Sequence, residues 1–368
     1  MELHREHYWR SHCLLLNPDF YRWQFVEPPG SIGEGGDQSI VAVDGDGRLL
    51  SYLGLVPMSA SCCGRSLRAA HLMTWLTAPA ARGHGVSMQL MSHVVEQFDF
   101  LFGRSVTPAA LAIYQRLNFR YFRACSRWVL VLDPKSTQDL VVDPSETSAK
   151  RAAARAVLPD KPPAFSVTTQ VPPGASALSK RVLSASTAFE RSEENLKWRY
   201  QRHPYLRYVF LVLGEPDEPL GVAVARVEDV RGRPGKVLRV VEFIAQPEHN
   251  RELAEAVAAF GLEHDCAFAD LFGMSERFVF GLVLIGGFNV LEEPDLKLPH
   301  LFQPWEADLD PPGLLFYGRR DDRTGQLGPA DDVTRIYVSK GDGNMDWPSW
   351  VPSAEGRSIA PPTRYSEG

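Results

Sequence analysis

The chain has 368 residues, which is enough for two domains that each bury a core. With 44% hydrophobic and 23% charged residues it is globular, and its net charge of −6 argues against nucleic acid as a partner. Residues 1–7 lack the apolar core of a signal peptide, and no apolar run approaches the roughly 20 residues that span a bilayer. Five cysteines without metal-ligand spacing predict reduced thiols, a cytoplasmic location and no bound metal.

The first expected elements are a strand, a glycine turn and a helix. Residues 72–79 are rich in apolar and β-favouring types and end at a proline, which predicts a strand. Gly83 and Gly85 then form a turn that opens a helix, and a glycine turn there can hold a phosphate through unpaired N–H groups and the helix dipole. Arg82 would add a positive charge, although a plain tight turn is the alternative. The apolar face of this helix would carry Val86, Leu90, Met91, Val94, Val95 and Phe98.

A second strand and a second helix follow in the chain. Residues 98–106 read as a strand. The helix after it is predicted to begin with Thr107 as the N-cap and Pro108 at the first helical position, and it carries Tyr114. A further strand is expected over residues 122–132.

This stretch resembles the GNAT superfamily of N-acyltransferases. Its motifs are Q/R-x-x-G-x-G/A after a bulged strand and Y-x-x-x-G-F at the end of a later helix; here they stand at residues 80–85 and 114–119. Ala80 replaces the usual Gln or Arg, which removes one side-chain contact to a pyrophosphate. Asn118 replaces a glycine, and asparagine also accepts left-handed backbone angles. The resemblance implies an α/β fold with an α+β mixed sheet.

The same resemblance implies acyl transfer from a coenzyme A thioester, expected to be acetyl-CoA, to an amine. Thr77 and Ala78 would pair with the pantetheine arm, and Tyr114 would protonate the departing thiolate, unless it is only a core aromatic. The general base is open: His71 on the strand, a residue of the second half, Asp342 or Asp346 of the C-terminal tail, or water. A purely structural strand residue is the alternative for His71. The pyrophosphate would lie on Arg82, Gly83, His84, Gly85, Val86 and Ser87.

Similar segments recur along the chain at nearly constant spacing. Trp23 and Trp198 stand in like surroundings at an offset of 198 − 23 = 175, and Trp75 and Phe243 at an offset of 243 − 75 = 168. Two further pairs, in residues 100–103 and 117–119, recur at offsets of 170 and 169. This pattern predicts two tandem GNAT-like acyl-CoA acyltransferase domains.

The second copy is predicted to be degenerate. Residues 248–252 contain no glycine and two carboxylates, which would repel a pyrophosphate, and the tyrosine is missing from residues 275–288. The predicted organisation is a catalytic domain at residues 1–133, a linker at 134–175, a degenerate domain with a C-terminal extension at 176–350 and a flexible tail at 351–368.

These features together predict an N-acyltransferase that acts on a small amine. The acceptor is expected to be an amino sugar, since residues 340–346 resemble a tail found in bacterial family members linked to surface-polysaccharide synthesis. The alternative from another class is a non-catalytic scaffold or binding module on the same fold. Aminoacyl transfer from a tRNA is disfavoured by the acidic balance and the intact glycine turn. A homo-oligomer stays open.

Overall fold

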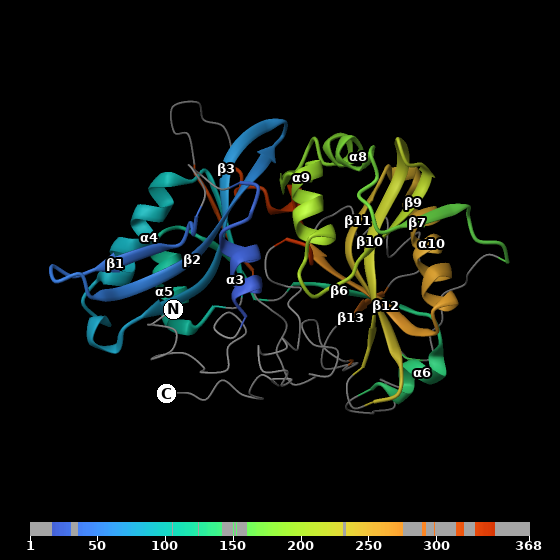
Figure 1. The fold of residues 1–368 in the computed structure, drawn as a ribbon, viewed down its shortest axis with the longest axis horizontal. Coiled ribbons are helices and arrows are strands. Elements are labelled where there is room, and N and C mark those ends of the chain that lie inside the picture. Colours follow the sequence, from blue (N-terminus) through green and yellow to red (C-terminus); the bar gives the residue numbers. More distant parts are fainter. Residues whose placement is uncertain are drawn as a thin grey trace.

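A computed structural model describes residues 17–30, 36–104, 106–123, 125–141, 150, 152, 160–230, 233–274, 289–291, 298, 314–319 and 328–342. Within these ranges fifteen strands join into one hydrogen-bonded sheet of mixed direction, which confirms the α/β class. Figure 1 shows two lobes, with helices α3 and α9 facing each other between them.

The first lobe forms around a sheet with helices α4 and α5 packed on one face. Asn17 caps the opening helix, because its side chain accepts a hydrogen bond from the Phe20 N–H at 3.0 Å. The buried face of α4 and the side chain of Tyr114 from α5 pack against alternate residues of β3. The elements are α3 (Pro18–Phe25), β1 (Ile40–Val43), β2 (Leu49–Cys62), β3 (Arg65–Thr77), η1 (Pro79–Ala81), α4 (Val86–Gln97), β4 (Phe100–Arg104), α5 (Pro108–Arg116) and β5 (Arg120–Phe122).

The second lobe has its own apolar core, in which α8 and α10 cover the sheet. The elements after the first lobe are β6 (Arg127–Val131), α6 (Pro134–Asp139), β7 (Phe165–Thr168), α8 (Ala175–Val182), β8 (Thr187–Phe189), α9 (Glu193–Leu196), the π-helical turn η2 (Lys197–Gln201), β9 (Val209–Glu215), β10 (Glu218–Asp229), β11 (Lys236–Ala245), η3 (Pro247–His249), α10 (Asn250–Glu263), β12 (Cys266–Met274), β13 (Asn289–Leu291), β14 (Leu314–Gly318), η5 (Val333–Arg335) and β15 (Ile336–Ser339).

Both lobes repeat one order of strands. In the first lobe β1, β2 and β3 are antiparallel, and β4 then pairs parallel to β3 after the crossing helix α4. In the second lobe β9, β10 and β11 are antiparallel, and β12 pairs parallel to β11 after α10. The pairing of β3 with β2 and that of β11 with β10 each contain a register shift. The bulge expected in the strand before the glycine turn is therefore present in β3.

Three strands cross between the two lobes. β6, which follows the first lobe in sequence, pairs with β12 of the second lobe, whereas β14, from the C-terminal part, pairs with β4 and β5 of the first. β15 lies between β8 and β12 and joins the two half-sheets. The single strand expected over residues 122–132 is wrong, because β5 and β6 are separate strands that belong to different lobes.

The segment between the lobes and the tail contains more structure than the sequence pattern indicated. β7 lies within the expected linker and pairs with the edge strand β9. Near the tail, a 3₁₀ turn at Val333–Arg335 leads into β15. Residues 275–288, Asp346 and the tail beyond 350 lie outside the described residues. The division of the chain into four segments stays a prediction.

The two lobes meet through a reciprocal contact of tryptophans. The Trp23 indole N–H donates to the Trp198 carbonyl at 2.9 Å, and the Trp198 indole N–H donates to the Trp23 carbonyl at 2.8 Å. The two rings stack with their centroids 5.1 Å apart. The pair at an offset of 175 in the sequence therefore lies face to face between the lobes.

Candidate functional site

The glycine turn leads directly into helix α4, as the sequence predicted. Gly83 and Gly85 both have φ of +80°, where a side chain would be strained, and Gly85 is the N-cap of α4. A Cβ built on either glycine meets no atom of the described chain within 4 Å, so the space beside the turn is open. The first N–H groups of a helix lack partners within it, and this exposed turn therefore offers donors to an anion.

A chain of hydroxyl groups connects the turn to the strand before it. Thr77 Oγ1 lies 2.9 Å from Ser51 Oγ and 2.9 Å from Ser87 Oγ, which ties the ends of β2, β3 and α4 together. The exposed Arg82 folds back, and its Nε donates to the Thr77 carbonyl at 3.2 Å. His84 is exposed at the tip of the turn. The cofactor-binding residues proposed from the sequence are thus neighbours.

Strand β3 has a free edge between its bulge and the glycine turn. Its parallel pairing with β4 ends at Leu72 and Gly103, but β3 continues to Thr77. Among the described residues no strand takes up the pairing of residues 73–77 on that side. An extended ligand can add to this edge as a strand would.

Tyr114 lies next to this edge on the face covered by the helices. Its ring packs edge-on against Trp75, with centroids 5.4 Å apart, and against Phe119 at 4.8 Å. The N-cap Thr107 and Pro108 at the first position set the start of its helix as expected. Burial raises the pKa of the Tyr114 phenol, so the group keeps its proton at neutral pH.

His71 lies on the opposite face of the same sheet, so the structure does not bring it together with Tyr114. It is buried and stacks on Phe102 with centroids 5.1 Å apart. Burial, together with the positive charges of Arg104 and Arg199, lowers its pKa well below the usual range. An imidazole that resists protonation is better suited to hydrogen bonding than to acting as a general base.

A pocket between the lobes contains Asp342, which was one of the expected candidates for the base, together with Arg191 and Glu242, which the sequence patterns did not identify. It has an empty volume of about 490 Å³, part of which is open solvent, and His71 and Met73 of β3 form part of its wall. Buried in the wall are Arg191, Glu242 of β11 and Asp342 of the tail. The tail was one of the places from which a base was expected.

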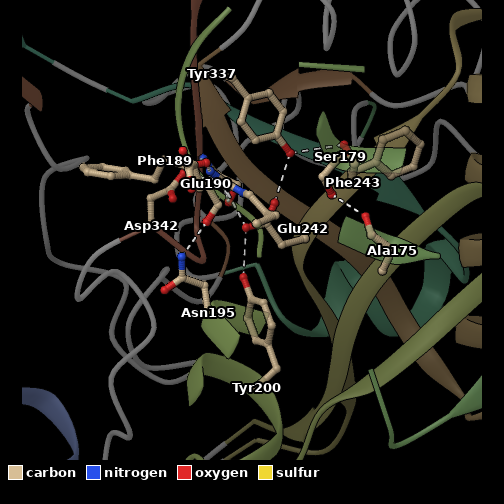
Figure 2. Close-up of polar contacts among 12 residues, drawn as sticks. Ala175, Ser179, Phe189, Glu190, Asn195, Tyr200, Glu242, Phe243, Tyr337 and Asp342 are labelled. Carbon is tan, nitrogen blue, oxygen red and sulfur yellow. Dashed lines mark hydrogen bonds and ion pairs between the residues drawn. The ribbon is translucent and has the colours of Figure 1, made fainter. Parts of the chain in front are cut away.

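Arg191 holds the two carboxylates together. Its Nη2 lies 3.0 Å from Glu242 Oε1 and 2.6 Å from Asp342 Oδ2. The hydroxyls of Tyr200 and Tyr337 donate to the two oxygens of Glu242 at 2.9 and 3.1 Å (Figure 2). Glu242 therefore accepts three hydrogen bonds from its neighbours.

The surroundings of Asp342 shift the pKa of its carboxyl group. Burial raises its pKa to about 6, the charge of Glu242 adds to this rise, and Arg191 opposes it. Its Oδ2 accepts hydrogen bonds from Arg191 and from the backbone N–H of Ser339 at 2.9 Å. The sequence repeat could have identified Glu242, because at the offset of 168 it corresponds to Thr74 of the first copy (242 − 168 = 74).

The second lobe lacks both features of the first-lobe site. Its turn η3 leads into α10 without a left-handed glycine, and His249 and Glu252 at the helix start pair at 2.7 Å. The gap beyond the last β11–β12 pair is filled by the tail, because the Gly341 N–H donates to the Val241 carbonyl at 3.0 Å. β15 pairs there with the end of β12. The gap between β11 and β12 is thus occupied by residues of the same chain.

Comparison with known proteins agrees with the first-lobe geometry. A family model described as an acetyltransferase (GNAT) domain matches residues 15–122. The matched segment covers the first lobe up to β5. The match ends at Phe122, the last residue of β5, and the next strand, β6, pairs in the second lobe. No curated protein matches the chain.

The solved structures to which the chain is similar are distant in sequence. They include a GCN5-related N-acetyltransferase from Anabaena variabilis (14% identity, TM-score 0.45, covering 76% of this chain and 62% of that one) and a probable N-acyltransferase from Enterococcus faecalis (10%, 0.46, 74% and 60%). A third is an N-myristoyltransferase from Saccharomyces cerevisiae (13%, 0.48, 86% and 76%). The chain spans about 60% of the length of the first two.

Two further findings concern membrane spans and metal sites. No helix in the described ranges is both long and apolar enough to cross a membrane. Likewise, the described part of the chain contains no group of three or more His, Cys, Asp or Glu side chains placed to hold a metal ion.

Proposed function

We propose that the chain transfers an acyl group, acetyl in the first instance, from coenzyme A to the amine of a small acceptor. One observation carries the proposal: the left-handed glycines at the start of α4 lie directly after the free edge of β3. The turn offers N–H donors to the pyrophosphate, and the edge offers backbone groups to the pantetheine arm. The GNAT match over residues 15–122 supports this assignment.

The residues around the free edge supply the chemistry of transfer. Backbone N–H groups of residues 73–77 would polarise the thioester carbonyl, and Thr77 and Ala78 would pair with the pantetheine. Tyr114 would give its proton to the thiolate as the C–S bond breaks and regain one from the attacking nitrogen. The raised pKa of Tyr114 supports this role, because a proton donor must stay protonated at neutral pH.

The second lobe would support the acceptor instead of a second coenzyme. Its turn carries Glu248 and Glu252 near the helix start, and residues 336–342 fill its strand gap. An amino sugar is the acceptor to test first, as expected from the likeness of residues 340–346 to tails linked with surface polysaccharides.

The test is isothermal titration of acetyl-CoA into the full chain and three variants. Gly83→Asp and Gly85→Asp place a carboxylate where the pyrophosphate would lie, and we expect each to weaken binding at least about 100-fold by charge repulsion. Gly64→Asp is the matched control, because Gly64 has a φ of +81° and equally open surroundings in the β2–β3 hairpin. We expect this control to bind acetyl-CoA as the unmodified chain does.

Two outcomes would count against the proposal. If a folded unmodified chain does not bind acetyl-CoA, the GNAT domain is a non-catalytic scaffold or binding module. If Gly64→Asp weakens binding as much as the two turn variants do, the effect comes from altered folding, and the cofactor site lies elsewhere.

A further inference from the structure

The pocket between the lobes contains buried polar atoms that have no hydrogen-bond partner among the described residues. Gln24 is 2% exposed, and neither its amide oxygen nor its amide nitrogen has a hydrogen-bond partner within the described chain. His71 is 1% exposed, and its Nε2 is likewise without a partner there. Both residues line the pocket. Buried polar groups are nearly always paired, so three unpaired atoms around one cavity point to a ligand with hydrogen-bonding groups.

The lining of this pocket also includes the Asp342 carboxylate, which has one oxygen without a hydrogen bond to the described residues. All contacts of the Asp342 side chain with described residues use Oδ2, which leaves Oδ1 available. Glu242 beside it is already occupied by Arg191, Tyr200 and Tyr337 (Figure 2). Of the two carboxylates that Arg191 holds, Asp342 is therefore the one that can accept a bond from an ammonium group.

The pocket also reaches the strand that would hold the thioester. His71 and Met73 belong to β3, and Met73 lies at the bulge where the free edge begins. An amine in the pocket would therefore lie beside the edge where the acyl group is expected. This step rests on the proposed function.

We propose that this pocket binds the acceptor as a primary ammonium that carries neighbouring hydroxyl groups, with Asp342 as the group that removes its proton. Gln24 and His71 hydrogen-bond the hydroxyls, which need both donors and acceptors. The ammonium gives one proton to Oδ1 of Asp342. The neutral amine attacks the thioester carbonyl, the C–N bond forms, the C–S bond breaks, and the thiolate leaves with the second proton of the nitrogen.

The pH dependence of the reaction follows from the surroundings of Asp342. As a base it acts when ionised, so kcat/KM should rise with pH up to the pKa of about 6 and then level off. The titratable and charged groups around it on the packed elements are Arg191, Glu242, Tyr337, Tyr200, Arg199, Glu190 and His71.

The binding test uses glucosamine as the probe, titrated into the full chain with and without coenzyme A. Gln24→Leu removes the unpaired amide, so we expect about tenfold weaker glucosamine binding with a melting temperature equal to or above that of the unmodified chain. A purely structural Gln24 would give the opposite sign for stability. Gln115→Leu, at an exposed position of α5, is the matched control and should change neither quantity.

The proton-transfer test measures acetyl transfer to glucosamine between pH 5 and 8. Asp342→Asn should lower kcat/KM at neutral pH and abolish its rise below about pH 6, whereas Asp139→Asn on the exposed surface of α6 should keep the full profile. Acetyl-CoA binding should be unchanged in all four variants.

The outcomes separate this proposal from the proposed function. Glucosamine affinity that stays within twofold in Gln24→Leu, or a pH profile retained in Asp342→Asn, would overturn the acceptor pocket while acetyl-CoA binding stands. An unmodified chain that binds no acetyl-CoA would instead overturn the acyl transfer itself, and glucosamine binding to the free chain would still report on the pocket.

Discussion

Among single residues, Tyr114 of α5 and His71 of β3 are two buried groups whose pKa values are shifted in opposite directions. Burial raises the pKa of Tyr114, whereas burial and two arginines lower the pKa of His71. Both groups are therefore neutral at pH 7, because in each case desolvation disfavours the charged form. A neutral phenol can donate a proton, but an imidazole with a lowered pKa is a weak base.

Tyr114→Phe tests the role of the phenol. The ring contacts with Trp75 and Phe119 remain, so we expect the melting temperature and acetyl-CoA binding to stay close to their original values. Loss of the proton donor should lower kcat by about 100-fold. Steady-state kinetics with titration calorimetry separate the two effects, and an unchanged kcat would leave Tyr114 as a core aromatic.

At the scale of elements, the segment that contains β15 decides what the second lobe can bind. It pairs with β8 and β12, and its Gly341 bonds to β11 in the gap that the first lobe leaves open. A Cβ on Gly341 would collide with the Tyr200 hydroxyl and lie 2.8 Å from Glu242 Oε1. The glycine is therefore needed for this close approach.

Gly341→Ala should lower the free energy of unfolding by about 1–3 kcal/mol, because the added methyl overpacks a buried polar cluster. Urea denaturation measures this difference. Gly45→Ala is the control, since a Cβ on Gly45 meets no described atom within 4 Å and its φ is not left-handed. Equal stability of the two variants would show that the tail is not seated in the gap.

At the scale of the whole molecule, the exchange of strands makes each lobe depend on the other. β6 completes the second lobe and β14 completes the first, while Trp23 and Trp198 exchange hydrogen bonds between them. Melting one lobe would expose the buried strands that it shares with the other.

We therefore expect a single cooperative transition in scanning calorimetry of the full chain, with equal calorimetric and van't Hoff enthalpies. Each lobe alone would lack a central strand pairing, so neither should stay folded after the other melts. Two separated transitions would show that the lobes are independent domains despite the shared strands.

Much of the first lobe could be predicted from local sequence. The glycine turn, the Thr107 cap and the start of α4 depend on short-range backbone chemistry, which a few neighbouring residues specify. An open edge at the end of β3 was expected from the family resemblance and not from the residue pattern. The route of β6 could not be predicted, because strand pairing depends on partners distant in sequence. The division of residues 122–132 into two strands is an example, since both segments have similar β-favouring composition.

Local sequence patterns were enough to predict the α/β class, the glycine turn before α4 and the residues that surround it. Only the tertiary structure decided that Gln24, His71, Glu242 and Asp342 share one pocket. These residues come from four distant parts of the chain, and their types are ordinary in isolation. Gln24 and His71 point to a site because they carry buried polar atoms without a partner among the described residues. Burial is a property of the packed fold and not of any local pattern.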